Sequence, residues 1–173
     1  MGMETEDLLG ASKDQLNLIL SFFARVESKL SVLLAINTGM LAFLASNAPP
    51  LKEFSCWMEI SATATLLLLA GSIAVLYRGA FPHLAGGEES LVYFRRIASR
   101  TEHKFIEEFK SQSAEQYSDD LLAQAWRNSV ILQAKFDALK QSFILTAFAI
   151  IPWVVSLALF AARNAQTRSG FLK

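Results

Sequence analysis

The sequence predicts an all-α membrane protein. We expect three transmembrane helices, of which the first and third extend into a cytosolic helical stalk together with one extra helix. Three runs contain no charged residue, namely residues 30–51, 60–77 and 141–162, which hold 22, 18 and 22 residues. Because a helix rises about 1.5 Å per residue, each run approaches the roughly 20 residues that a bilayer core about 30 Å thick requires. Backbone groups in hydrocarbon must be bonded within their own segment, so each span should be helical.

Composition argues against several classes of function. The 16 basic and 16 acidic residues give a net charge of zero, which offers no case for nucleic-acid binding. Cys56 is the single cysteine, so we expect neither an intrachain disulfide nor a thiolate metal cage. His83 and His103 lie far apart in the sequence, and we expect no metal site. No nucleophile paired with a base, phosphate-cradling glycine loop or carboxylate pair is evident, so we expect neither catalysis nor a cofactor.

The first element should be a long helix that begins in water and ends in the bilayer. Ser12 and Gln15 form a capping-box pattern at its start. Apolar residues then recur at alternating steps of three and four, as in a heptad seam. This first seam comprises Leu16, Ile19, Phe23, Val26, Leu30, Leu33, Asn37, Met40 and Leu44.

The later elements follow from prolines, aromatic residues and a second capping box. Two prolines end the first helix, and Trp57 and Tyr77 bracket the second span at the two interfaces. A polar helix is expected over residues 88–110. Ser113 and Gln116 then cap a helix that should enter the bilayer as one continuous rod. Its own seam comprises Leu122, Ala125, Ser129, Leu132, Phe136, Leu139 and Phe143.

Together these signals divide the chain into seven segments. The expected order is a flexible tail (1–11), the first long helix (12–48), a short external hairpin (49–56), the second span (57–78), a cytosolic helical segment (79–142), the third span (143–162) and a C-terminal tail (163–173). The positive-inside rule places the N-terminus in the cytosol, because twelve Lys and Arg residues are then internal and four external. The tail opposes this orientation with three basic residues and no acidic one, but reversing the protein would reverse the whole count.

Asn37 lies in the middle of the first uncharged run, on the first seam. An unpaired amide in hydrocarbon is costly, so Asn37 should find a partner. Two interpretations stay open. One is a lock between protomers that fixes register or oligomeric state, and the other is a hydrogen bond within one protomer worth about 1 kcal/mol. The candidate residues for helix pairing or oligomerisation are Asn37, Leu33, Met40, Ser129, Leu132 and Phe136.

Two groups of polar residues are candidates for ligand binding. Basic residues recur every four positions in the 88–110 helix, and guanidinium groups match phosphate oxygens. A solvated face or contact with lipid headgroups is the alternative. Beside the second seam, two amides and a lysine have a spacing that would let them read a nucleobase edge and an anion, or else flank a helix pair. The candidate nucleotide-binding residues are Arg96, Arg100, Lys104, Gln124, Asn128 and Lys135.

Several of these segments together resemble a known family. The relevant residues are the 25–37 segment entering the first span, Pro82, the Phe94-Arg95-Arg96-Ile97-Ala98 run, Gln124, Asn128-Ser129 and Lys135-Phe136. In this combination, across roughly residues 20–162, the chain is similar to the membrane effectors of Pycsar, the bacterial pyrimidine cyclase system for antiphage defence.

The resemblance implies a function as well as a location. Such effectors sit in the bacterial inner membrane, and a neighbouring cyclase makes cyclic UMP or cyclic CMP on infection. The nucleotide activates the effector, which impairs the membrane and kills the cell before the phage matures. The expected partners are therefore the lipid bilayer, a cyclic pyrimidine mononucleotide and further copies of the chain. The sequence contains no recognisable β-roll nucleotide-binding domain, so sensing should use the helical stalk or a protomer interface.

Two alternatives to this function remain open. The chain fits an effector of another nucleotide-signalled defence system, which would answer a different messenger. It also fits a non-lethal membrane anchor or regulatory subunit that docks a cytosolic partner through the stalk. Gene neighbourhood distinguishes a Pycsar effector from an effector of another system, because a neighbouring cyclase gene favours Pycsar and a neighbouring oligonucleotide synthetase gene favours the other system. Expression without a partner should be harmless for an anchor.

Overall fold

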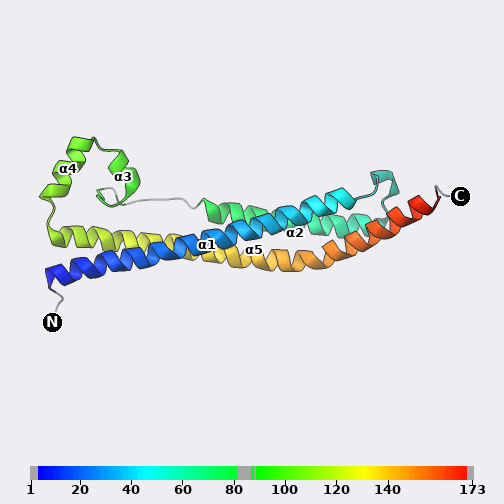
Figure 1. Ribbon diagram of the computed structural model, residues 1–173, viewed down its shortest axis with the longest axis horizontal. Coiled ribbons are helices and arrows are strands. Elements are labelled where there is room, and N and C mark those ends of the chain that lie inside the picture. Colours follow the sequence, from blue (N-terminus) through cyan, green and yellow to red (C-terminus); the bar gives the residue numbers. More distant parts are fainter. Residues whose placement is uncertain (1–3, 82–86, 88, 171–173) are drawn as a thin grey trace. The chain divides into compact units, whose positions relative to one another are not determined.

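The computed structural model describes residues 4–81, 87 and 89–170 of the chain, and 89% of these described residues are helical. No strand occurs in these ranges, in agreement with the predicted all-α class. The elements are α1 (Thr5–Asn47), the short 3-10 helix η1 (Leu51–Glu53), α2 (Cys56–Ala80), α3 (Phe94–Ala98), α4 (Glu102–Ser111) and α5 (Ala114–Gly170) (Figure 1).

The chain folds as two compact units. One unit, here called the polar unit, consists of residues 1–27 and 82–135, and the other, the span unit, consists of residues 28–81 and 136–173. Helices α1 and α5 contribute residues to both, whereas α2 belongs to the span unit and α3 and α4 to the polar unit.

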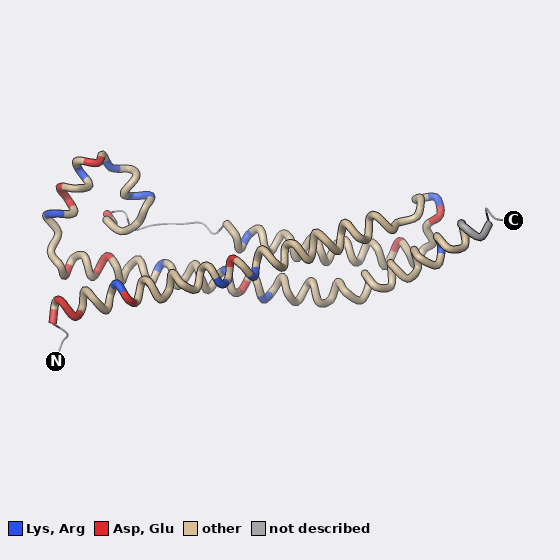
Figure 2. Tube along the Cα trace, viewed as in Figure 1, with Lys and Arg blue, Asp and Glu red and all other residues tan. Residues whose placement is uncertain are grey.

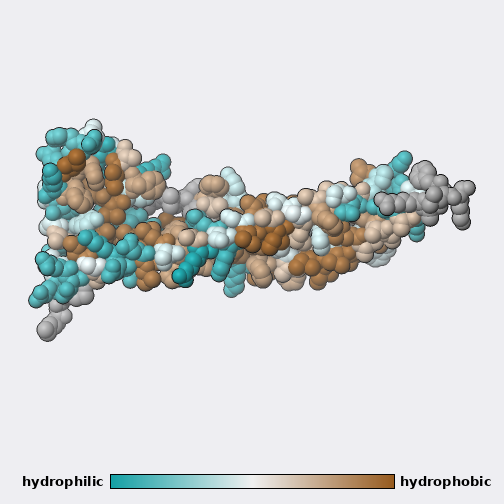
Figure 3. Space-filling view, in the orientation of Figure 1, coloured by the Kyte–Doolittle hydropathy of each residue, from teal (hydrophilic) through white to brown (hydrophobic). Residues whose placement is uncertain are grey.

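Three long helices make up most of the span unit, and they contain the uncharged runs except for residues 48–51, which follow α1. Figure 2 shows α1, α2 and α5 side by side here, with charged residues gathered at their ends and uncharged helix between. Hydrophobic residues also cover most of the visible surface of this unit in Figure 3. α1, α2 and α5 are each long and apolar enough to cross a bilayer. The chain therefore has the build of a three-span membrane protein.

One end of the span unit is closed by an apolar cluster. Its buried members are Leu44 of α1, Met58 and Ala62 of α2, and Phe160 of α5. The partly buried Phe54 packs on it, with its ring centroid 5.4 Å from that of Phe160. This cluster brings the C-terminal part of α1 and the start of α2 against the same stretch of α5.

In the span unit, the face that α5 buries consists mostly of small and polar residues, with Phe160 as the large apolar exception. Ala138, Ser142, Thr146, Ala149 and Ser156 are all buried, and their spacings of four, four, three and seven residues place them on one helix face. Small residues let helix backbones approach closely in lipid, where large apolar side chains gain little by facing inward. The second predicted seam does not describe this face, because Leu122, Phe136 and Phe143 are exposed.

The first predicted seam describes the packing of α1 well. Seven of its nine positions are buried, and the two others, Phe23 and Met40, are half-buried. In the polar unit, Leu16 and Ile19 pack against Leu121 and Ala125 of α5. The first seam is therefore used inside one protomer.

In the polar unit, α4 and the loop before α3 pack against α5. The ring of Phe109 in α4 lies 5.3 Å from that of Tyr117 in α5, and Val92, just before α3, packs on the cluster of Leu16 and Leu121. The predicted capping box at the start of α5 is confirmed. The Ser113 N–H donates to Gln116 Oε1 (3.0 Å) and the Gln116 N–H donates to Ser113 Oγ (3.2 Å).

Two predicted boundaries differ from the structure. α1 begins at Thr5, so Ser12 lies inside the helix and its hydroxyl donates to the Leu8 carbonyl (2.7 Å). A single helix over residues 88–110 is also wrong. Its first residue lies outside the described residues, and α3 and α4 are separated at residues 99–101, where the Thr101 hydroxyl accepts from the Lys104 N–H and caps α4.

Candidate functional site

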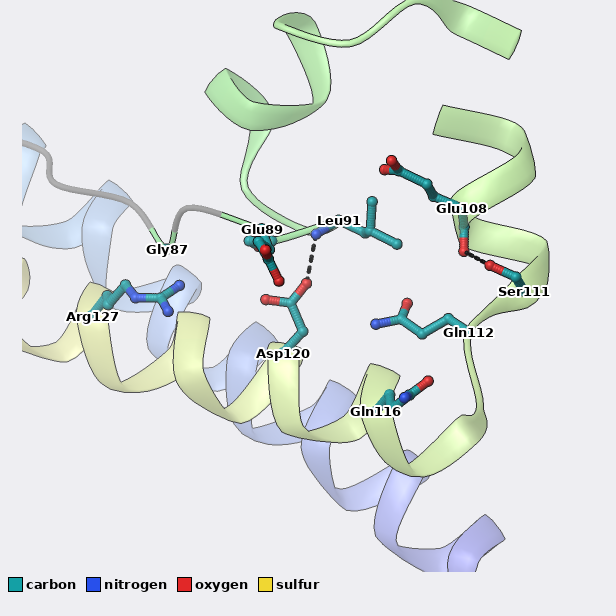
Figure 4. Close-up of a pocket in the computed structure, with 10 residues that line it drawn as sticks. Gly87, Glu89, Leu91, Glu108, Ser111, Gln112, Gln116, Asp120 and Arg127 are labelled. Carbon is teal, nitrogen blue, oxygen red and sulfur yellow. Dashed lines mark hydrogen bonds between the residues drawn. The ribbon is translucent and has the colours of Figure 1, made fainter. Parts of the chain in front are cut away.

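A cavity of about 740 Å³ in the polar unit is the candidate ligand site. Its size lies within the range usual for small-molecule sites. Figure 4 shows Arg127 beside Gly87 at one end, Gln112 and Gln116 at the other, and Asp120 between them. The lining residues are Gly87, Glu89, Ser90, Leu91, Glu108, Ser111, Gln112, Gln116, Asp120 and Arg127.

Asp120 holds the loop that forms one wall of the cavity. Its Oδ2 accepts from the backbone N–H groups of Leu91 (2.7 Å; Figure 4) and, beyond the residues drawn there, Val92 (3.1 Å). The hydroxyl of Ser90 accepts from the N–H groups of Val92 (3.2 Å) and Tyr93 (3.0 Å), the residues that lead into α3. Both backbone N–H groups donate to a carboxylate, and such charge-assisted hydrogen bonds are stronger than those between neutral groups.

The guanidinium of Arg100 is hydrogen-bonded to residues of the same wall. It donates to Glu108 Oε2 (2.6 Å) and to the carbonyl oxygens of Ser90 (3.2 Å), Arg96 (2.8 Å) and Glu89 (3.1 Å). Lys104 lies 3.7 Å from the other oxygen of Glu108. Arg100 thus joins α3, α4 and the loop before α3, and together with Lys104 it offsets the charge of Glu108 at the cavity wall.

The predicted basic stripe is therefore not a single surface. Arg96 is on α3, Lys104 is on α4, and Arg100 lies between these two helices. Within the described part of the chain, the side chain of Arg96 makes no hydrogen bond or ion pair, and it does not line the cavity.

Arg127 is the basic group that faces the cavity. Its Nη1 donates to Gln124 Oε1 (3.4 Å), and Gln124 Nε2 donates to Asn128 Oδ1 (3.4 Å). An added Cβ at Gly87 would overlap the Arg127 guanidinium, so the backbone of residue 87 lies directly against this side chain. The two predicted amides, Gln124 and Asn128, thus lie next to the cation of the site without lining the cavity.

Two further amides line the opposite end of the cavity. Gln116 uses its Oε1 in the capping box, which leaves its NH₂ group to donate to a ligand. Gln112 Oε1 is a buried acceptor without a hydrogen-bond partner among the residues that the structure describes. An unsatisfied buried polar atom is costly.

Lys135 lies apart from this cavity. Its side chain is buried, and its Nζ lies 3.4 Å from Glu27 Oε1 of α1. This ion pair joins α1 to α5 in the polar unit. Of the six predicted nucleotide-binding residues, the structure therefore brings Gln124, Asn128, Arg100 and Lys104 to the surroundings of the cavity, and none of the six lines it.

The predicted pairing residue Asn37 lies at the centre of a hydrogen-bonded layer in the span unit. Its Nδ2 donates to Ser72 Oγ of α2 (2.7 Å), and its Oδ1 accepts from Thr146 Oγ1 of α5 (2.8 Å). Ser72 Oγ also lies 2.6 Å from Ser142 Oγ and 3.0 Å from Thr146 Oγ1. All four side chains are buried. Every partner of Asn37 here belongs to the same protomer.

The other predicted pairing residues have varied surroundings. Leu33 is buried and Leu132 packs on the polar-unit cluster, whereas the carbonyl of Met40 accepts from Trp153 Nε1 (3.0 Å). Ser129 bonds the Ala125 carbonyl of its own helix (2.9 Å). Phe136 is exposed.

Sequence reasoning missed Arg127, Gln112 and Asp120. A signal for Arg127 was present, since it follows Gln124 by three residues and so lies on the same helix face. Asp120 gave no signal, because its partners are backbone N–H groups of a distant loop. No group of side chains suited to hold a metal ion occurs in residues 4–81, 87 and 89–170.

Comparison with known proteins identifies the family. The Pycsar effector protein domain matches residues 11–162, which is most of the chain. The chain belongs to the Pycsar effector family. It is accordingly a transmembrane effector of the Pycsar antiphage type, and this domain is that of an effector and not of a known enzyme. Neither the curated proteins nor the solved structures include a match.

Proposed function

We propose that this Pycsar effector is activated by cyclic UMP or cyclic CMP from a neighbouring cyclase, oligomerises in the bacterial inner membrane and impairs it, so that the infected cell dies. The observation that supports this most is the family match across all three span-length helices. The N-terminus and the polar unit lie in the cytosol in this proposal, as the basic residues favour.

The cavity in the polar unit is the proposed nucleotide site. Arg127 pairs with the cyclic phosphate, because a guanidinium is a charge-assisted donor suited to phosphate oxygens. At the other end, Gln112 and Gln116 offer amide groups to the edge of the pyrimidine. Because Glu108 is paired with Arg100 and Lys104, Asp120 and Glu89 are the two lining carboxylates whose negative charge would repel the anion.

Oligomerisation follows from the size of the switch. Moving a two-state equilibrium from about 1% to 99% active requires the ligand to prefer the active state by about 5.5 kcal/mol. One hydrogen bond to a charged group contributes about 1.5–3 kcal/mol, so a single Arg127–phosphate contact supplies only part of this. Several coupled copies, each with a modest preference, reach the total.

The exposed apolar face of α5 is the proposed contact between copies. Ile144, Phe148, Ile151 and Val155 follow steps of four, three and four, and each is 44–68% exposed. This stripe replaces the first seam of α1 as the pairing surface, because that seam is buried within the protomer. Light scattering of the detergent-solubilised protein should show a larger particle when the activating nucleotide is added.

Dye release from liposomes that contain the full-length protein tests the proposed activity. Cyclic UMP or cyclic CMP should cause release, whereas cyclic AMP and cyclic GMP should not. Arg127→Gln should raise the nucleotide concentration for half-maximal release at least tenfold, because it removes the proposed phosphate contact. Arg95→Gln is the matched control, since Arg95 is exposed on α3 and does not line the cavity.

Three results would contradict parts of this proposal. Silence with every nucleotide would argue against activation by such messengers. Release that only a purine nucleotide triggers would point to another signalling system. Equal responses of the two arginine variants, both inserted to the same extent in the liposomes, would remove the cavity from the proposal.

A further inference from the structure

A groove in the span unit lies where the uncharged runs of α1 and α5 begin. It has a volume of about 510 Å³ and is lined by one stripe from each helix. From α1 come Ser28, Lys29, Val32, Leu33 and Ile36, and from α5 come Phe136, Leu139, Lys140 and Phe143.

The groove is polar at one end and apolar over the remainder of its length. Lys29 immediately precedes the uncharged run of α1, and Lys140 immediately precedes that of α5. Both lysines are exposed, and neither forms an ion pair or hydrogen bond with another residue in the described part of the chain. Two amines and the Ser28 hydroxyl are therefore free to bind an anion at the mouth of the groove.

Apolar side chains form the remainder of the groove. Leu33 is buried at its base, whereas Val32, Ile36 and Phe143 are 57%, 48% and 64% exposed. The lining residues of α1 extend about 12 Å along the helix, from Ser28 to Ile36. This places an apolar channel directly below a pair of cations, at the depth where a span meets the headgroup layer.

We propose that this groove binds one anionic phospholipid, with its phosphate between Lys29 and Lys140 and an acyl chain along Val32, Ile36 and Phe143. Charge complementarity favours an anionic lipid as the ligand, because anionic headgroups attract basic side chains at the membrane surface. The apolar part of the groove is suited to contact with an acyl chain. Asp137 is an exposed acidic group on the same stretch of α5, and Glu27, which precedes Ser28 in the sequence, is paired with Lys135. The inference requires membrane insertion and is independent of nucleotide activation.

Native mass spectrometry of the full-length protein in neutral detergent tests this inference. Phosphatidylglycerol should bind at least tenfold more tightly than phosphatidylcholine with the same acyl chains. Lys29→Gln with Lys140→Gln should abolish this preference. Lys13→Gln with Lys110→Gln is the matched control, because it removes the same charge from exposed positions of the polar unit and should preserve the preference.

Two further arms test the apolar part of the site. Val32→Trp, which fills the channel without changing charge, should weaken phosphatidylglycerol binding at least fivefold. Glycerophosphoglycerol, the same headgroup without acyl chains, should not bind detectably. Equal affinity for the two lipids, a preference that survives the Lys29 and Lys140 substitutions, or a groove that cross-links to a second copy through Val32→Cys would overturn the proposal.

Discussion

Asn37 illustrates how much of the span unit depends on one side chain. Its amide bonds Ser72 of α2 and Thr146 of α5, so three helices meet at this residue. Asn37→Ala removes both bonds and leaves space in a buried layer. We expect a loss of about 1–2 kcal/mol in the free energy of unfolding, because such bonds in membranes contribute roughly this much. Reversible unfolding in mixed micelles of dodecyl sulfate and neutral detergent measures it.

Thr38 provides the control for this prediction. Its hydroxyl bonds only the Leu34 and Ala35 carbonyls of its own helix and is exposed. Thr38→Ala should change the free energy of unfolding by less than about 0.5 kcal/mol. If the Asn37 variant were no less stable than the Thr38 variant, the layer would not hold the helices together.

Single residues were also where sequence reasoning was weakest. A polar residue in an uncharged run must be satisfied, so Asn37 could be identified from the sequence alone, although not its partners. Arg100 and Arg127 could not be ranked in this way. Both are arginines on polar segments, and only the fold shows that Arg100 bonds three backbone carbonyls while Arg127 faces the cavity.

At the level of elements, spans were predictable and helix faces were not. Length and absence of charge depend only on composition, so α2 lies within two residues of its predicted ends. The buried face of α5 was missed because the heptad rule places large apolar residues inside. In lipid, large apolar side chains gain little by facing another helix, so the heptad rule does not apply. Ala138, Ser142 and Thr146 are buried instead.

The contact between α2 and α5 yields a prediction at this scale. A Cβ at Gly79 would lie 2.5 Å from the Cβ of Ala138, which is fixed to the backbone of α5. Gly79→Ala therefore requires the two helices to separate, and we expect it to lower the free energy of unfolding by about 1–3 kcal/mol. The same micelle titration measures this change.

A second glycine of α2 serves as the control. At Gly71 the nearest atom to an added Cβ is Leu145 Cδ1 at 3.8 Å, an ordinary contact. Gly71→Ala should be neutral or stabilising, since alanine is the better helix former. Adding Ala138→Gly to the Gly79 variant should restore part of the stability. Equal effects at both glycines would show that α2 and α5 are not in close contact there.

For the whole molecule, the orientation in the membrane is open to a direct test. Cys56 is exposed at the start of α2, and no other cysteine occurs in the chain. With the N-terminus in the cytosol, Cys56 lies outside. A membrane-impermeant maleimide should therefore label it in intact spheroplasts.

A relocated cysteine completes this experiment. Cys56→Ser with Ser113→Cys places the thiol at the exposed start of α5, which should react only after the spheroplasts are lysed. Labelling of the second variant in intact cells, with protection of Cys56, would reverse the orientation. It would also move the proposed nucleotide site to the wrong side of the membrane.

The hydrogen-bonded layer around Asn37 has a consequence for how the three spans find each other. Lipid tails are as apolar as leucine. An apolar surface therefore favours insertion of a helix into the bilayer, but it does not determine the depth or rotation of that helix relative to its neighbours. The four polar side chains of the layer determine this depth and rotation, because they are all hydrogen-bonded only when α1, α2 and α5 are aligned as in the structure. The apolar surface of each span thus determines that it inserts into the membrane, while a few polar atoms determine which helix it packs against.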